Sequence, residues 1–230
     1  MNRHVYDATL DANSDRKGFF ASSNLVTATG FFRLRDLYSG LYDSILPQFN
    51  QVGLISMWSA GCSDGREPYS IALCTQRYIH SHPENRLSTF KLRASDITEK
   101  MIQTGNDNNY ELNTSEVDRL KPYERYVTFN DEKRVTVNGE VRRKIDFVLE
   151  DIIKHKAQKK YDIMICTNVL FYYEMEYRKS IITDLLNNLK PGGYLYVESI
   201  GGRFMRSIDL DKFGTGNHFF KYGEESSRRR

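Results

Sequence analysis

The sequence predicts an α/β fold with a mostly parallel central sheet. From Leu54 onward, short apolar runs that are typical of buried strands alternate with segments in which apolar residues recur at helical spacing. This alternation is typical of parallel strands joined by crossover helices. Of the 230 residues, 40% are hydrophobic and 13% are aromatic, which is too apolar for a disordered chain. We therefore expect one main globular domain with a small insertion.

The first predicted strand and helix stand on either side of a glycine-containing turn. Leu54–Ser59 is the apolar run of the strand, and residues 60–65 form the turn, Ala-Gly-Cys-Ser-Asp-Gly. Pro68 suits the first turn of the helix that follows. That helix has a face of residues three and four positions apart, namely Ile71, Cys74 and Tyr78. Upstream of the strand, residues 29–46 are expected to form a helix that lies over the sheet.

Four more strand candidates follow, with helices between them. The second strand ends at Asp96, and a helix begins near Thr98. A later helix over residues 175–190 stops at Pro-Gly-Gly, a sequence that favours the end of a helix. The remaining strand candidates are Ile145–Asp151, Tyr161–Leu170 and the apolar run 194–200.

Residues 110–143 interrupt this rhythm. They are polar and contain an alternating stretch, Arg-Val-Thr-Val, followed by Asn138-Gly139, a dipeptide that is a strong hairpin-turn signal. We expect a small antiparallel insertion here, and an inserted hairpin is a candidate docking surface. The predicted organisation is a short N-terminal extension, residues 1–28, and a main domain, residues 29–230, that carries this insertion.

The charge of the chain argues against a nucleic-acid partner. There are 33 Lys and Arg residues against 30 Asp and Glu residues, which gives a net charge of +3. The three arginines at 228–230 account for that surplus, so the folded body is close to neutral. A protein that binds nucleic acid through its phosphates needs a larger basic surface than this.

Cysteine usage and hydropathy point to a cytoplasmic location. The three cysteines are Cys62, Cys74 and Cys166, and they have neither the C-x-x-C pairs of a zinc site nor the density of a disulfide scaffold. The five histidines show no metal-ligand spacing, so we expect no metal. No apolar run approaches the ~20 residues that a bilayer requires, and residues 1–24 lack a signal-peptide core. We therefore expect no membrane insertion.

Three acidic or amide side chains are expected near the sheet edge where α/β folds bind ligands. Two of them end predicted strands, and the third lies in the first turn of a predicted helix. Asp96 can accept both ribose hydroxyls of a nucleotide, or it can cap the next helix together with Glu99. Glu67 can neutralise a ligand ammonium, or it can be an acid that the helix dipole favours in a first turn. Asn168 ends a central strand and is either a ligand contact or a turn residue.

The glycine turn, Arg33 and Tyr172 have equally open interpretations. A glycine turn before a helix lets a ligand approach bare backbone amides, but residues 60–65 match neither the dinucleotide G-x-G-x-x-G motif nor a P-loop. Arg33 is by default a surface arginine on an amphipathic helix, and Tyr172 a core or turn residue. These residues alone leave ligand binding and ordinary structure as alternatives.

In combination, the motifs closely resemble those of the CheR family, the chemotaxis receptor methyltransferases that use S-adenosylmethionine. The matching strings are TATGFFR, WSAGCSDGREPYSIAL, ASDIT, YDIMICTNVLFYY and LKPGGYLYVES. They stand in the family's order and spacing across about three quarters of the chain, from Thr29 to Ser199. The resemblance implies a Rossmann-like methyltransferase sheet of seven strands with one reversed strand near the end, for which His218–Tyr222 is the candidate. It also makes residues 110–143 a receptor-docking subdomain.

The resemblance implies an activity, a cofactor and partners. The chain is expected to be a monomeric protein-glutamate O-methyltransferase that acts on the cytoplasmic domain of chemoreceptors, with S-adenosylmethionine as cofactor. The alternative is a CheR-like module that binds S-adenosylmethionine but has another substrate or no activity.

The resemblance also implies the roles of individual residues. Glu67 matches the acid that contacts the methionine moiety of the donor, and Asp96 matches the aspartate that holds its ribose. Asp151 stands where relatives have an asparagine near the adenine. The expected catalytic residues are Arg33 and Tyr172. The expected cofactor-binding residues are Thr29, Ala60, Gly61, Cys62, Glu67, Asp96, Asp151 and Asn168.

The chain departs from the family pattern at a few positions. Thr167 stands where relatives mostly have an arginine, in a Cys-Arg-Asn sequence. Glu198-Ser199-Ile200-Gly201 replaces the Gly-His-Ser-Glu that follows the fifth strand in relatives, and Arg66 replaces a glutamate. Relatives also carry many more residues before the T-x-F-F-R motif than the 28 found here.

Overall fold

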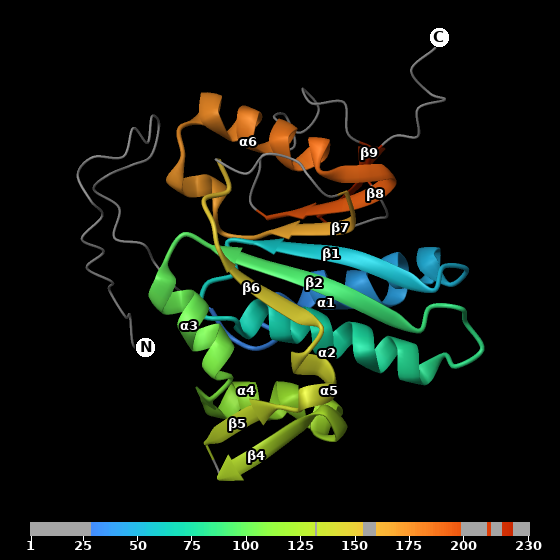
Figure 1. Ribbon diagram of the computed structural model, residues 1–230, viewed down its shortest axis with the longest axis vertical. Coiled ribbons are helices and arrows are strands. Elements are labelled where there is room, and N and C mark those ends of the chain that lie inside the picture. Colours follow the sequence, from blue (N-terminus) through green and yellow to red (C-terminus); the bar gives the residue numbers. More distant parts are fainter. Residues whose placement is uncertain (1–28, 132, 154–159, 199–210, 213–217, 223–230) are drawn as a thin grey trace.

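The chain is built around a seven-stranded sheet in the order β6-β2-β1-β7-β8-β10-β9. The computed structural model (Figure 1) describes residues 29–131, 133–153, 160–198, 211–212 and 218–222. The strands of the sheet are β1 (Leu54–Ala60), β2 (Thr89–Asp96), β6 (Ile145–Leu149), β7 (Tyr161–Cys166), β8 (Leu189–Val197), β9 (Asp211–Lys212) and β10 (Phe219–Lys221).

Five neighbouring strands of this sheet run parallel. β1 lies between β2 and β7, and both pairings are parallel, as are those of β2 with β6 and of β7 with β8. β10 runs antiparallel to β8 and lies within the candidate segment 218–222, so the predicted reversed strand is confirmed. Because the five parallel strands end at the same edge, the residues that follow them meet there.

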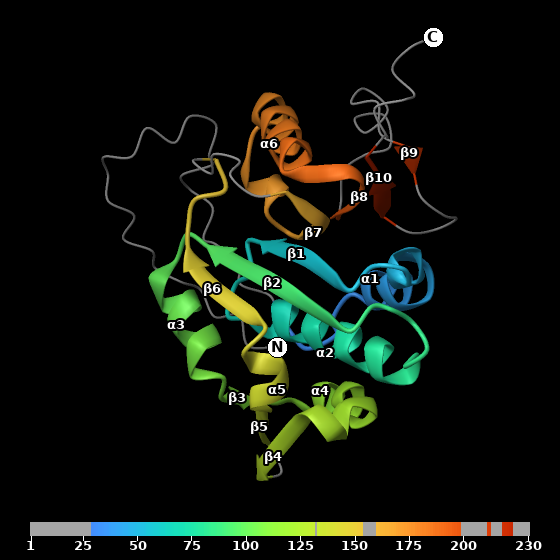
Figure 2. The same ribbon diagram turned by 45° about the vertical axis from the view of Figure 1, so that its right-hand side comes forward.

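Helices cover both faces of the sheet. Figure 2 shows α1 (Arg35–Gly40) and α2 (Arg66–Ser81) on one side and α6 (Met175–Asn187) on the other. α3 (Glu99–Asp107) shares the hydrophobic core of α1 and α2, through Ile102. On the opposite face, Ile182 and Leu185 of α6 pack with Trp58 in a second core. The two cores confirm the predicted layers of a doubly wound fold.

Residues 29–34 are not helical, although a helix was predicted over 29–46. The amide N–H of Phe31 donates to the Glu116 carboxylate at 3.0 Å, and that of Phe32 donates to Ser70 Oγ at 2.9 Å. These long-range bonds satisfy the amides outside a helix. The helix begins at Arg35 and continues as the irregular turns η1 (Leu41–Ile45) and η2 (Leu46–Phe49).

A separate three-stranded antiparallel sheet, β3-β5-β4, lies within the predicted insertion. In Figure 1 it lies at the bottom of the view, below the main sheet. Its strands are β3 (Tyr110–Glu111), β4 (Val127–Asp131) and β5 (Arg134–Val137), and its helical elements are α4 (Thr114–Leu120), η3 (Lys121–Tyr126) and α5 (Gly139–Arg142).

The predicted hairpin turn at Asn138-Gly139 is wrong. β4 pairs with β5, so the hairpin connection precedes Arg134, and Gly139 opens α5 instead. A two-residue type I′ turn needs positive φ at both residues, whereas Asn138 has φ −63° and ψ 150°. Its side chain is held by Thr128, whose hydroxyl donates to Oδ1 at 2.8 Å, and by Nδ2 donation to the Arg125 carbonyl.

Candidate functional site

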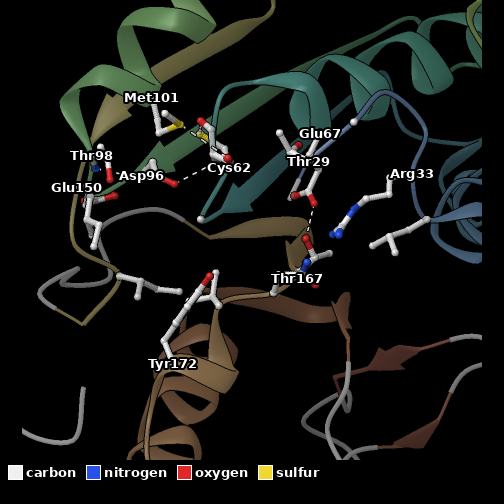
Figure 3. Close-up of a pocket in the computed structure, with 18 of the residues that line it drawn as sticks. Thr29, Arg33, Cys62, Glu67, Asp96, Thr98, Met101, Glu150, Thr167 and Tyr172 are labelled. Carbon is white, nitrogen blue, oxygen red and sulfur yellow. Dashed lines mark hydrogen bonds between the residues drawn. The ribbon is translucent and has the colours of Figure 1, made fainter. Parts of the chain in front are cut away.

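A cleft opens at the carboxyl edge of the parallel strands. It encloses about 950 Å³, including the part open to solvent. Glu67, Thr167 and Arg33 gather at one end, and Asp96 and Glu150 at the other (Figure 3). Eight of the ten predicted site residues line it: Thr29, Arg33, Gly61, Cys62, Glu67, Asp96, Asn168 and Tyr172.

The floor of the cleft is the glycine turn between β1 and α2. The amides of Gly61 and Cys62 both donate to the Ser95 carbonyl, at 2.8 and 2.9 Å, which ties this turn to the end of β2. Gly61 has φ +79°, and a Cβ there would come within 2.1 Å of a methyl of Val169. Only glycine allows the chain to take this path so close to Val169.

Asp96 is held rigidly at the end of β2. Its Oδ1 accepts from the amide of Thr98 and its Oδ2 from the amide of Ser63, each at 2.9 Å. Burial raises the pKa of this carboxyl group, and the two amide bonds partly offset the effect. The capping alternative is not realised, because α3 has Thr98 as its N-cap and begins at Glu99. Carboxylate oxygens have further lone pairs to offer.

Glu67 lies in the first turn of α2 with two hydroxyl groups on its carboxylate. Ser59 Oγ donates to Oε1 at 2.8 Å, and Thr167 Oγ1 donates to Oε2. The residue is 8% exposed, and burial raises its pKa, while the two hydroxyl bonds and the charge of Arg33 act in the opposite direction. The result is an oriented, poorly solvated carboxylate, which is suited to a cationic ligand.

Arg33 reaches the cleft from the non-helical segment before α1. In the amide orientation that satisfies its neighbours, Asn168 Oδ1 accepts from Nη1 and Nη2 of Arg33 at 2.9 and 2.6 Å, and its Nδ2 donates to Glu198. Asn168 takes up the left-handed conformation, with φ 54°. Arg33 is thus fixed by a side chain from the end of β7 instead of extending into solvent.

The segment that carries Arg33 is held by two side chains of α4. Glu116 in α4 accepts from the Phe31 amide, while Arg119 Nη1 donates to the Phe31 carbonyl at 3.1 Å. Glu116 also lies 3.3 Å from Nε of Arg66. Arg66, a departure from the family pattern, therefore has acidic partners here, since it also pairs with Asp64.

Tyr172 belongs to the short turn η4 (Leu170–Tyr172) that follows β7. Figure 3 shows it extending into the cleft from the side opposite Glu67 and Thr29. Tyr173, which follows it, also lines the cleft. An aromatic ring placed between the two carboxylate ends can exclude water from the middle of the site.

Ala60 and Asp151 do not line the cleft. Ala60 is buried in the core on the α6 face, and Asp151 Oδ1 accepts from the amide of Ile153 at 3.1 Å. The residues on either side of Asp151, Glu150 and Ile152, line the cleft instead. Side chains alternate along an extended chain, so the side chain of Asp151 faces different surroundings from those of its two neighbours.

The sequence interpretation also missed several residues that line the cleft. Thr167 was noted only as a departure from the family pattern, yet it binds Glu67. Met101 was hidden by the ordinary apolar spacing of α3, and Ser63 Oγ lies 3.8 Å from its sulfur. The amide of Glu150 donates to the Asp96 carbonyl at 2.8 Å, which places the residue after β6 beside the end of β2. The usable signal in the sequence was the position of Glu150 near the end of a predicted strand.

The described residues offer neither a metal-binding cluster nor a membrane-spanning helix. No cluster of three or more histidine, cysteine, aspartate or glutamate side chains there could hold a metal ion. None of the helices in those ranges has the length and apolar character needed to span a bilayer.

Comparisons with known proteins place the chain in a family. Residues 27–201 match the family described as CheR methyltransferase, SAM binding domain. Chemotaxis protein methyltransferase Cher2 of Pseudomonas putida is 29% identical over 176 residues, which are 74% of this chain and 63% of that protein. The chemotaxis protein methyltransferase of Vibrio parahaemolyticus is 30% identical over 83% of this chain and 72% of its own. That of Listeria monocytogenes is 26% identical over 87% and 74%.

Proposed function

Since this chain belongs to the CheR methyltransferase family, we propose that it transfers a methyl group from S-adenosylmethionine to glutamate side chains of a chemoreceptor's cytoplasmic domain. The observation that carries this proposal is the placement of Glu67 and Asp96 at opposite ends of one cleft, with Arg33 beside Glu67. The chain spans 63% of the first relative and just under three quarters of the other two, so the complete activity is part of the proposal.

The residues of the cleft fit S-adenosylmethionine group by group. Glu67 is a desolvated carboxylate that suits the ammonium of the methionine moiety. Asp96 can accept from the ribose hydroxyls, since carboxylate oxygens offer lone pairs beyond those used by the amides of Thr98 and Ser63. Beyond Asp96, the apolar side chains of Met101 and Ile152, with Glu150 beside them, suit the face and the amino group of an adenine.

The proposed reaction needs little acid–base help from the protein. Bound S-adenosylmethionine supplies a methyl group on a positively charged sulfur. A glutamate side chain with a pKa near ~4.3 is already ionised at neutral pH, so no general base has to remove a proton. The protein's task is to align the carboxylate and to keep water away from it.

Arg33 is the residue proposed to orient the substrate carboxylate. Two of its N–H groups face Asn168, and a guanidinium has further donors that stay available for a carboxylate oxygen. Holding one oxygen leaves the other available for attack on the methyl group. Tyr172 is proposed to pack beside the transferred methyl and exclude water.

Labelled methyl transfer tests this proposal. The purified chain is incubated with methyl-labelled S-adenosylmethionine and the cytoplasmic domain of a chemoreceptor from the same organism, and base-labile methyl esters are then counted. Label on glutamate that is lost on mild base treatment supports the proposal. Its absence in a protein that still binds S-adenosylmethionine would contradict it.

A second candidate is an S-adenosylmethionine-binding module with another substrate or no transferase activity. The observation that favours it is Thr167, which stands where relatives have an arginine and whose hydroxyl donates a hydrogen bond to the carboxylate of Glu67. Glu198 likewise accepts a hydrogen bond from the side chain of Asn168. Donor binding by calorimetry with no transfer to any receptor domain supports this second candidate.

A further inference from the structure

A basic groove runs along the surface beside the cleft. We define the basic groove by Arg35, Tyr42, Arg77, Arg119 and Tyr123, which line it together with Arg33. These residues come from α1, η1, α2, α4 and η3, so the groove joins the main domain to the inserted segment. The proposed binding of S-adenosylmethionine in the cleft gives no role to this groove.

Within the part of the chain that the structure describes, the arginines that define the basic groove form no ion pairs. Arg35, Arg77 and Arg119 are all exposed, and within the described ranges none of them has a carboxylate oxygen within 4.0 Å. Arg66 and Arg93, by contrast, are both paired. The acidic residue that lines the groove is Asp43. Three unpaired guanidinium groups on one surface favour an acidic ligand.

Two of the arginines are held in place before any ligand binds. Arg77 packs over the rings of Tyr42 and Tyr123, with its guanidinium carbon 5.7 and 5.5 Å from their centroids. Arg119 donates to the Phe31 carbonyl and to Ser115 Oγ at 3.1 and 3.2 Å. Side chains that are already ordered lose less conformational entropy when a ligand binds.

The groove leads into the cleft. Arg33 and Tyr38 line both, so a chain that lies in the groove arrives at the guanidinium proposed to orient the substrate. We propose that the basic groove binds an acidic segment of the protein substrate, next in sequence to the glutamate that is methylated. This inference rests on the proposed function and assigns it a substrate-binding surface.

The aromatic residues of the groove fit a peptide better than a nucleic acid. Base recognition on single strands uses exposed ring faces for stacking. Tyr123 is buried, with Phe32 stacked on it at 4.3 Å and 13° and Arg77 also packed over its ring. These rings support the arginines instead of offering a platform, which favours a partner recognised by its carboxylates.

Charge reversal at an exposed groove arginine tests the proposal. Arg35→Glu changes an exposed side chain that has no carboxylate partner within the described ranges. Arg86→Glu is the matched control, because Arg86 is exposed and lies in the loop between α2 and β2, outside the groove. We expect Arg35→Glu to raise the KM for the receptor domain about 3- to 10-fold, with kcat and the Kd of S-adenosylmethionine unchanged. Arg86→Glu should leave all three unchanged.

A binding measurement separates this proposal from the proposed function. A fluorescent twelve-residue peptide rich in glutamate is titrated with the full chain by anisotropy, which needs no methyl transfer. Weaker binding to Arg35→Glu and Arg77→Gln than to Arg86→Glu supports the groove even if no receptor is methylated. Equal peptide affinity and equal KM in all variants would overturn it, as would tighter binding of a single-stranded RNA of the same length.

Discussion

The hydroxyl of Thr167 donates a hydrogen bond to the carboxylate of Glu67, a residue 100 positions earlier in the chain. One lies after β7 and the other in the first turn of α2, and the parallel pairing of β1 with β7 brings the two strand ends together. The contact matters because Glu67 is buried, and each donor that it receives favours its charged form.

Removing this hydroxyl should destabilise the protein. For Thr167→Val we expect the free energy of unfolding at pH 7.5 to fall by about 1.5–3 kcal/mol, the value of a hydrogen bond to a charged group. At pH 4 the loss should shrink to about 1 kcal/mol, because Glu67 is then protonated. Urea unfolding measures both. Thr183→Val is the control, since Thr183 is exposed on α6, and an equal loss there would argue against the ionic contribution.

Neutralising Glu67 should stabilise the ligand-free protein and weaken donor binding. Burial raises the pKa of Glu67, so the folded state is less stable above that pKa than it would be with a neutral side chain. For Glu67→Gln we expect the Tm at pH 7.5 to rise by about 2–4 °C, the shift that ~1 kcal/mol gives in a domain of this size.

The pH dependence of that difference has a definite sign. Near pH 4 both folded and unfolded wild-type chains carry a largely protonated Glu67, and the Tm difference should vanish. As pH rises through the raised pKa, the unfolded chain loses this proton first, wild-type stability falls, and the difference grows to its full value. A Tm difference that does not change with pH would show that packing, not ionisation, is its source.

Asp96→Asn should weaken S-adenosylmethionine binding about 10- to 100-fold, because the variant loses a charged acceptor and presents an amide N–H₂ group to the amide of Thr98 or Ser63. Calorimetric titration measures the Kd. Asp151→Asn is a suitable comparison, since Asp151 does not line the cleft. If the two variants lose affinity equally, Asp96 has no special role.

Arg33→Ala should lower kcat about 100-fold through misalignment of the substrate while changing the Kd of S-adenosylmethionine by less than about threefold. The charge of Arg33 also lowers the pKa of Glu67, so both constants are measured across a range of pH, which separates this effect from the alignment of the substrate. Arg33→Lys keeps the charge without the planar fork and should recover little of kcat. Equal losses in kcat and affinity would count against an orienting role.

The strand pattern was accessible from sequence because it is local. A buried parallel strand is a short apolar run in the sequence, and each of the five predicted runs contains a strand of the sheet. Their ends were less predictable. Tyr161–Leu170 stops as a strand at Cys166, and the helix expected over 29–46 starts at Arg35. Amides in that segment bind Glu116 and Ser70, which no local pattern reveals.

The residues of the candidate site divide in the same way, into those that the sequence identified and those that only the fold brings together. Gly61, Glu67 and Asp96 were named from the sequence through the resemblance to the CheR family, since their places in a turn, a first helical turn and a strand end left ordinary structure as an alternative. What the tertiary structure alone decided is which side chains face one another: Thr167 on Glu67, Asn168 on Arg33, and Glu150 instead of Asp151 in the cleft. Such contacts depend on strand register and on the alternation of side chains, and a shift of one residue there reverses which side chain meets the ligand.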